Sequence, residues 1–157
     1  MDRPATTMAR IRSGTRVAGM ASIMSRAVDA LERARYDEAA SLFQHAAQLE
    51  PESALAWLGV GVSCTRILRT DEAEDALQRA AQLAPDDFFA RFRLGELYLR
   101  IGLAAQAREA LERAMDLSRD SEQRRMVREL LAVDDRRAAR RVWRPDFAKL
   151  LGRKRSQ

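Results

Sequence analysis

The chain has 157 residues, of which 46% are hydrophobic and 32% are charged, and it carries a formal net charge of +5. This length suits one domain with a sizeable core, and this composition excludes a chain that is disordered throughout. Ala, Leu, Arg and Glu dominate and are strong helix formers, while no stretch alternates apolar and polar residues as a half-buried strand would. We therefore expect an all-α protein.

The positive charge is concentrated at the two ends of the chain. Residues 1–19 hold four Arg against one Asp, and residues 20–121 hold twelve Arg against seventeen acids. Residues 122–157 hold twelve basic residues against five acids. The body of the chain is therefore acidic, which weakens the nucleic-acid-binding interpretation that the net charge alone would invite.

The sequence also restricts compartment and crosslinks. A single cysteine, Cys64, excludes an internal disulfide and a cysteine-based zinc site. No apolar run approaches the length of a membrane span, and the N-terminus lacks the apolar core of a secretory signal, although its Arg/Ser/Thr-rich composition leaves a transit peptide open. We expect a cytoplasmic protein with a flexible, basic N-terminal extension over residues 1–19.

One phrase recurs along the chain at a constant interval. Tyr36–Pro51 and Thr70–Pro85 match at nine of sixteen positions, and a third copy begins at Ala104, as far from Thr70 as Thr70 is from Tyr36. In this register, small and large residues coincide at Ala27/Gly61/Gly95, Ala39/Ala73/Ala107, Phe43/Leu77/Leu111 and Ala46/Ala80/Ala114. Small residues that recur opposite a large one indicate closely packed helix pairs.

Each repeat of this register predicts two helices. We expect first helices over Met20–Arg33, Ser53–Arg66 and Asp86–Arg100, and second helices over Tyr36–Leu49, Thr70–Leu83 and Ala104–Leu117. Pro51 and Pro85 end one unit and open the next. Gly102 marks the turn inside the third unit.

Two further segments follow the third unit. SEQRRMVRELLAVDD, with an apolar stripe, predicts a seventh helix that we place at residues 122–132 as a cap on the stack. Residues 133–157 then form a basic tail. Within it Trp143, Phe147, Leu150 and Leu151 fall at helical spacing around Pro145, which predicts a short amphipathic helix.

This pattern resembles the tetratricopeptide repeat, whose signature places large, small, aromatic, Ala, large, Ala and Pro residues at fixed spacing within each repeat. The second unit fills it with Trp57, Gly61, Ala73, Leu77, Ala80 and Pro85, and the third with Gly95, Tyr98, Ala107, Leu111 and Ala114. The first unit is weaker. The resemblance covers residues 20–121 as units 20–53, 54–87 and 88–121, and it implies a right-handed solenoid of three helix pairs.

By this resemblance, the first helices line a concave groove that holds a partner. The implied groove residues are Met24, Val28, Leu31, Leu55, Leu58, Val62, Arg66, Phe89, Phe92, Glu96, Leu99 and Arg100. Some relatives bind C-terminal carboxylates through Lys, Asn and Arg at these places, whereas this chain has mainly aliphatic residues. An apolar groove favours a peptide or helix with hydrophobic anchors, with Phe89 and Phe92 as hot spots. The alternative is that these residues are core or are covered by the protein's own tail.

No catalytic or cofactor site is predicted. Cys64 and His45 are the only residues of their types and fall in different units, so no nucleophile–base pair is implied. The chain contains no Gly-rich phosphate loop and no metal-ligand cluster. We expect a non-enzymatic protein without cofactor or metal, in which Cys64 is buried and His45 lies on the outer surface.

Three functions remain open. The first is an adaptor that binds a protein or peptide partner in the groove, and a homodimer is compatible with it. A narrower version is a class II type III secretion chaperone for a translocator, because WLGVGVSC (Trp57–Cys64) is similar to the second repeat of that family; the Arg-rich ends and long basic tail depart from it. The third is association with nucleic acid or an anionic membrane through the basic cluster Arg136, Arg137, Arg140, Arg141, Arg144, Arg153, Lys154 and Arg155. That cluster has a simpler alternative role, to neutralise the acidic body.

Overall fold

The computed structural model describes residues 5–142, and the side chains of residues 19–136 within them. The described residues form seven α-helices and no strand, which confirms the all-α prediction. The helices are α1 (Ala5–Glu32), α2 (Tyr36–Leu49), α3 (Ala54–Arg66), α4 (Thr70–Leu83), α5 (Phe88–Ile101), α6 (Ala104–Leu117) and α7 (Ser121–Val142).

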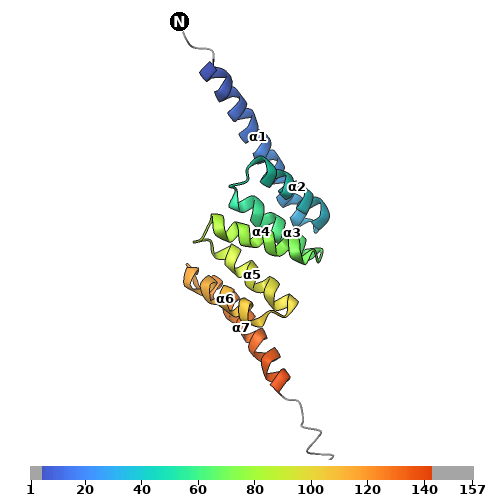
Figure 1. Ribbon diagram of the computed structural model, residues 1–157, viewed down its shortest axis with the longest axis vertical. Coiled ribbons are helices and arrows are strands. Elements are labelled where there is room, and N and C mark those ends of the chain that lie inside the picture. The colour runs from blue at the N-terminus through green and yellow to red at the C-terminus, as the bar shows by residue number, and fades with distance from the viewer. Residues whose placement is uncertain (1–4, 143–157) are drawn as a thin grey trace, which may run out of the picture.

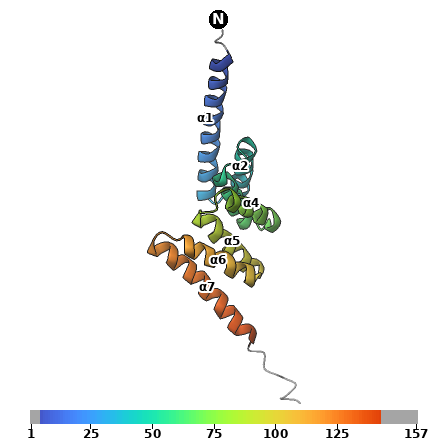
Figure 2. The same cartoon turned by 60° about the vertical axis from the view of Figure 1, so that its left-hand side comes forward.

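The helices stack in chain order into an elongated solenoid (Figure 1). Each helix packs on the next along the chain, and α1, α3, α5 and α7 also contact one another in that order. This pattern, in which a unit touches only its neighbours, is typical of repeat proteins. Both terminal helices continue past the stack, α1 at one end and α7 at the other (Figure 2). None of the described helices has the length and apolarity that a membrane span needs.

Side-chain caps fix where two of the first helices begin. The Ser53 hydroxyl accepts a hydrogen bond from the Ala56 N–H at 3.4 Å, and the Asp87 carboxylate accepts bonds from the N–H groups of Phe89 and Ala90 at 3.3 and 3.1 Å. These bonds satisfy N–H groups that have no partner inside the helix. The three second helices begin and end at the residues predicted from the sequence.

The turn inside each unit repeats the same backbone geometry. The turn residue has a positive φ in all three units, 57° at Ala34, 63° at Leu68 and 83° at Gly102. The N–H of the following residue then reaches back into the preceding helix, from Arg35 to Ala30, from Arg69 to Cys64 and from Leu103 to Tyr98, at 2.8, 3.0 and 2.9 Å. This is the Schellman ending of a helix, which the sequence signals plainly only where glycine occupies the turn.

The core follows the small-to-large pairing that the repeat register predicts. A Cβ atom added to Gly61 would lie 2.6 Å from Leu77 Cδ2, and one added to Gly95 would lie 2.6 Å from Leu111 Cδ2. Leu77 and Leu111 are themselves fully buried. Glycine therefore lets the two helices of a unit approach closely, and the leucine fills the crossing.

Both ends of the described chain are more helical than expected. The segment that we expected to be a flexible extension is part of α1 from Ala5 onward, and α7 continues to Val142 instead of ending at residue 132. No proline interrupts residues 5–19, and the Ala, Met and Arg residues there favour a helix, although Gly14, Gly19 and three threonines oppose it. The predicted amphipathic helix around Pro145 lies outside the described residues.

Candidate partner-binding face

The predicted groove residues lie on three helices that touch one another. α1 contacts α3, and α3 contacts α5. We call the set of twelve residues the first-helix face: Met24, Val28 and Leu31 on α1, Leu55, Leu58, Val62 and Arg66 on α3, and Phe89, Phe92, Glu96, Leu99 and Arg100 on α5.

Each of the three helices leaves one large apolar side chain open to solvent on this face. Leu55 is 64% exposed, Phe89 44% and Val28 43%. Half-buried apolar side chains accompany them at Met24, Leu31, Leu58 and Val62. Large apolar side chains left in water on three adjacent helices are the kind of surface that a partner covers.

Two members of the predicted groove are buried instead. Phe92 is only 5% exposed and Leu99 only 6%. The Phe92 ring stacks on Phe88 with centroids 5.4 Å apart, and the Arg93 guanidinium lies 5.7 Å from its centre. Phe88, Phe92 and Leu99 all belong to the main core cluster. Of the two phenylalanines predicted as hot spots, Phe89 is therefore exposed and Phe92 is a core residue.

The α5 part of the face is charged as well as aromatic. Arg93 donates to the Glu96 carboxylate at 2.7 Å, and both side chains are roughly 30% exposed. Arg66 and Arg100 are exposed nearby in the predicted set. The sequence reasoning missed Arg93, although its helical spacing from Phe89 and from Glu96 places it on the same side of the helix. The face is thus apolar over α1, apolar over α3 except for Arg66 at the end of that helix, and mixed over α5.

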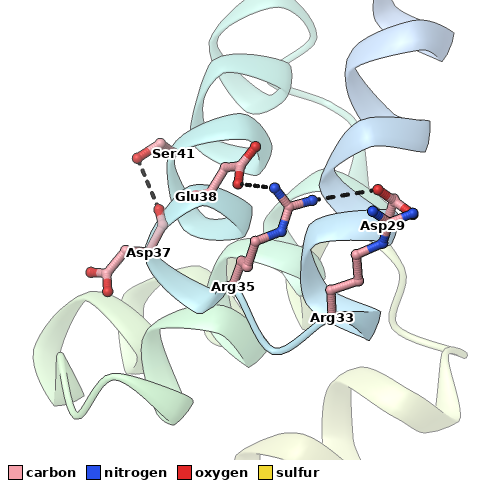
Figure 3. Close-up of polar contacts among 6 residues, drawn as sticks. All are labelled: Asp29, Arg33, Arg35, Asp37, Glu38 and Ser41. Atoms are coloured by element: carbon pink, nitrogen blue, oxygen red, sulfur yellow. Dashed lines mark hydrogen bonds and ion pairs between the residues drawn. The ribbon is translucent and has the colours of Figure 1, made fainter.

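Ion pairs surround the turn between α1 and α2 (Figure 3). The Arg35 guanidinium lies between the carboxylates of Glu38, at 2.7 Å, and Asp29, at 3.5 Å, and Arg33 pairs with Asp29 at 3.0 Å. The Ser41 hydroxyl donates to the Asp37 carbonyl at 3.0 Å in the first turn of α2. These groups are largely solvent-exposed, so each pair contributes little stability. They lie at the turn that follows the face residues of α1.

Polar contacts also join successive units. The Tyr98 hydroxyl donates to Glu74 at 3.0 Å and accepts from Gln78 at 3.2 Å, which connects α5 to α4. Burial raises the pKa of Tyr98 above its ordinary value, so the hydroxyl keeps its proton. Arg108 on α6 donates to Asp134 and Asp135 on α7 at 3.0 and 2.7 Å. These bonds attach α7 to the stack, and the hydrogen bond to Asp135 raises the pKa of Arg108.

Two sequence models of the tetratricopeptide repeat match the chain, over residues 24–88 and over residues 69–131. Together they span more than half of its length. The chain belongs to the tetratricopeptide repeat family. No curated protein matches it by sequence.

Solved tetratricopeptide repeat structures share this fold. The Yersinia enterocolitica type III secretion chaperone SycD, in complex with a peptide of the translocator YopD, matches with a TM-score of 0.72 and 20% identity over 77% of this chain and 95% of that one. PcrH, in complex with the chaperone-binding region of PopD, gives 0.70 and 17% identity over 79% and 94%. The first repeat domain of Spaghetti (RPAP3), bound to the HSP90 peptide SRMEEVD, gives 0.65 and 16% identity over 73% and 91%. At these identities the likeness establishes the architecture.

The remaining predicted residues of this repeat protein lie apart from the face. Cys64 is fully buried, and burial is the main cause that raises the pKa of its thiol. His45 is exposed on α2, a second helix. Within the part of the chain that the structure describes, no three His, Cys, Asp or Glu side chains gather as metal ligands would. A pocket of about 350 Å³ lies at the start of α5, lined by Phe88 and Phe89, by Arg119 before α7 and by Gln123 in the first turn of α7.

The predicted basic cluster falls mostly outside the description. Arg136 is exposed on α7. Arg137, Arg140 and Arg141 lie on the last turns of α7, where only the backbone is described. Arg144, Arg153, Lys154 and Arg155 lie beyond the described residues.

Proposed function

We propose that this protein is a non-enzymatic adaptor that binds a segment of a partner protein on its first-helix face. One observation carries the proposal: Val28, Leu55 and Phe89 leave a large apolar side chain exposed on each of three adjacent first helices. Leu55 and Phe89 occupy the same position in successive units, and Val28 occupies the position of Val62 and Glu96. Apolar side chains on three adjacent helices suit a segment with several apolar anchors. Phe89 offers the largest contact area of the three, at a low entropic cost.

The spacing of the helices limits the spacing of the anchors. Packed helices have axes about 10 Å apart, and an extended peptide advances about 3.3 Å per residue. A partner segment in extended form should therefore carry apolar side chains about three residues apart. If such a segment buried about 600 Å² of apolar surface, the gross gain would be about 15 kcal/mol. The cost of ordering the peptide cancels much of that gain, so we expect micromolar affinity.

The chemistry of the face favours an apolar segment over an acidic C-terminus. The RPAP3 neighbour was solved with the HSP90 peptide SRMEEVD, SycD with a peptide of the translocator YopD, and PcrH with the chaperone-binding region of PopD. Where carboxylate-binding relatives place polar and basic residues, this chain has Met24, Val28, Leu58 and Val62. We therefore place its ligand in the class of apolar-anchored segments. A narrower version, a chaperone for a secreted translocator, rests on the likeness to SycD and PcrH and predicts secretion genes beside its own.

A displayed peptide library tests the proposal. Leu55→Glu places a charge on the face, and Ala105→Glu is a matched control, because both residues are exposed and each is the second residue of its helix. An acid suits that position of a helix, so both variants should fold. Wild type and the Ala105→Glu control should enrich peptides with apolar residues about three apart, and Leu55→Glu should retain them at least about tenfold less. Equal enrichment by Leu55→Glu would remove the face from the proposal.

A further inference from the structure

A second concavity lies between the second helices α4 and α6, with α5 beneath it. Its volume is about 280 Å³. Its floor is apolar and small, because Ala81, Leu94 and Ala110 line it and are buried. None of its lining residues belongs to the first-helix face, so an inference from it stands independently of the proposed function.

Two arginines stand at one end of this pocket. α5 and α6 are antiparallel with Gly95 opposite Leu111, so Arg91, one turn before Gly95, lies at the same end of the helix pair as Arg113. In the described part of the chain neither guanidinium has an ion pair or a hydrogen bond. Glu109 is the one acid in the lining, which leaves the pocket with a net positive charge.

The preceding unit contains the same site in a closed form. At the equivalent positions one repeat earlier, Ala47 corresponds to Ala81 and Arg79 to Arg113, but Trp57 stands in the place of Arg91. Trp57 packs in one cluster with Ala47, and its indole N–H donates to the Pro51 carbonyl at 2.9 Å. Arg79 pairs with Glu52 at 3.3 Å. In this unit an aromatic ring packs beside the alanine and the arginine has an acidic partner. In the next unit an arginine takes the place of the ring, and both cations are free of partners within the described residues.

We propose that the pocket between α4 and α6 is a second binding site, for a partner segment that carries an Asp or Glu next to an apolar residue. The carboxylate pairs with Arg91 and Arg113, since a guanidinium binds a carboxylate through two parallel hydrogen bonds. The apolar side chain covers the floor of Ala81, Leu94 and Ala110. Glu109 repels additional negative charge, which favours a single carboxylate over a polyanion such as nucleic acid.

The test uses the full-length protein labelled with ¹⁵N and the capped peptide acetyl-Gly-Glu-Leu-Gly-amide. We expect saturable amide shifts around Ala81 and Ala110. Arg91→Trp copies the closed site of the preceding unit, and Arg91→Gln removes the charge without adding bulk. Either variant, or a peptide with Gln in place of Glu, should weaken binding about tenfold, the effect expected for loss of a charged hydrogen bond. Arg79→Gln is the control and should bind as wild type does.

Three results would each overturn the site. They are an absence of saturable shifts at the pocket, equal affinity for the Glu and Gln peptides, and wild-type affinity in both Arg91 variants. Shifts confined to the first-helix face would overturn it as well, because they would place the peptide elsewhere on the molecule.

Discussion

Gly95 on α5 faces the side chain of Leu111 on α6 so closely that a Cβ atom on Gly95 would lie 2.6 Å from Leu111 Cδ2. The same relationship holds between Gly61 and Leu77 one unit earlier. The crossing of the two helices in a unit is therefore set by a missing side chain on one helix and a buried leucine on the other. That crossing positions the first helices, and with them the exposed apolar residues of the proposed binding face.

Adding one methyl group at this crossing should destabilise the fold. Gly95→Ala should lower the free energy of unfolding by about 1–3 kcal/mol, the usual cost of overpacking a core. Leu111→Ala removes the clashing atoms, so the double variant should lose less than the sum of the two single variants. Urea denaturation of all three measures this. Gly19→Ala is the control, because nothing lies within 4 Å of the new atom; it should be neutral or slightly stabilising. Additive losses would contradict the contact.

The positive-φ turns give a prediction of opposite sign at two equivalent positions. Gly102 and Leu68 occupy the same place in successive units, with φ of 83° and 63°. Gly102→Ala should cost about 1 kcal/mol because a Cβ atom is strained there. Leu68→Gly relieves that strain and removes an exposed leucine, so it should be neutral or stabilising by up to about 1 kcal/mol. Thermal melts decide the matter, and a clear loss of stability in Leu68→Gly would argue against the left-handed turn.

The repeat could be predicted from the sequence because packing imposes the same residue sizes at the helix crossing of each unit. Gly61 and Gly95, and the leucines opposite them, recur at the same place in successive repeats since each unit must make the same crossing. The start of α1 could not be predicted from the repeat. Residues 5–19 fall outside the repeat pattern, and helix propensity alone does not fix where a helix begins.

The residues of the candidate site could be predicted only in part, because the repeat register gives positions and not side-chain contacts. The register gives Phe92 the same position in its unit as Leu58 and Met24, and the resemblance assigns this position to the groove. The register does not reveal that the Phe92 ring stacks on Phe88 inside the core. The positions equivalent to Arg93 in the two earlier units hold Gly59 and Ser25, so the repeat register does not mark Arg93 as a residue of the face. The full run of helical spacing, which joins Phe89, Arg93 and Glu96, would have included it.

Phe89 and Phe92 should respond differently to the same substitution. Phe92→Glu buries an unpaired charge in the core and should lower the melting temperature strongly, with a loss of several kcal/mol. Phe89→Glu affects a half-exposed ring and should leave most of the stability intact. Circular dichroism melts of both variants test this. Comparable stability of the two would show that Phe92 is not a core residue.

Cys64 predicts a pH dependence of stability. Burial raises the pKa of its thiol above the ordinary value of 9.0. Above that pH the unfolded chain has released a proton that the folded chain still holds, so the free energy of unfolding should fall as the pH rises. Tyr98, whose pKa burial also raises, acts in the same direction at a higher pH. Urea unfolding at about pH 8 and about pH 10 should show the loss, and Cys64→Ala should reduce it. An identical loss in Cys64→Ala would exclude the thiol as its source.

The most direct test of the adaptor proposal is the dissociation constant of one selected peptide on three single variants. Val28→Glu, Leu55→Glu and Phe89→Glu each place a carboxylate on a different first helix at a side chain that is at least 43% exposed. If one peptide spans the face, calorimetry should show each variant binding it about tenfold more weakly or worse, while Ala105→Glu binds as wild type does. Wild-type affinity in all three variants would show that the peptide binds elsewhere on the molecule.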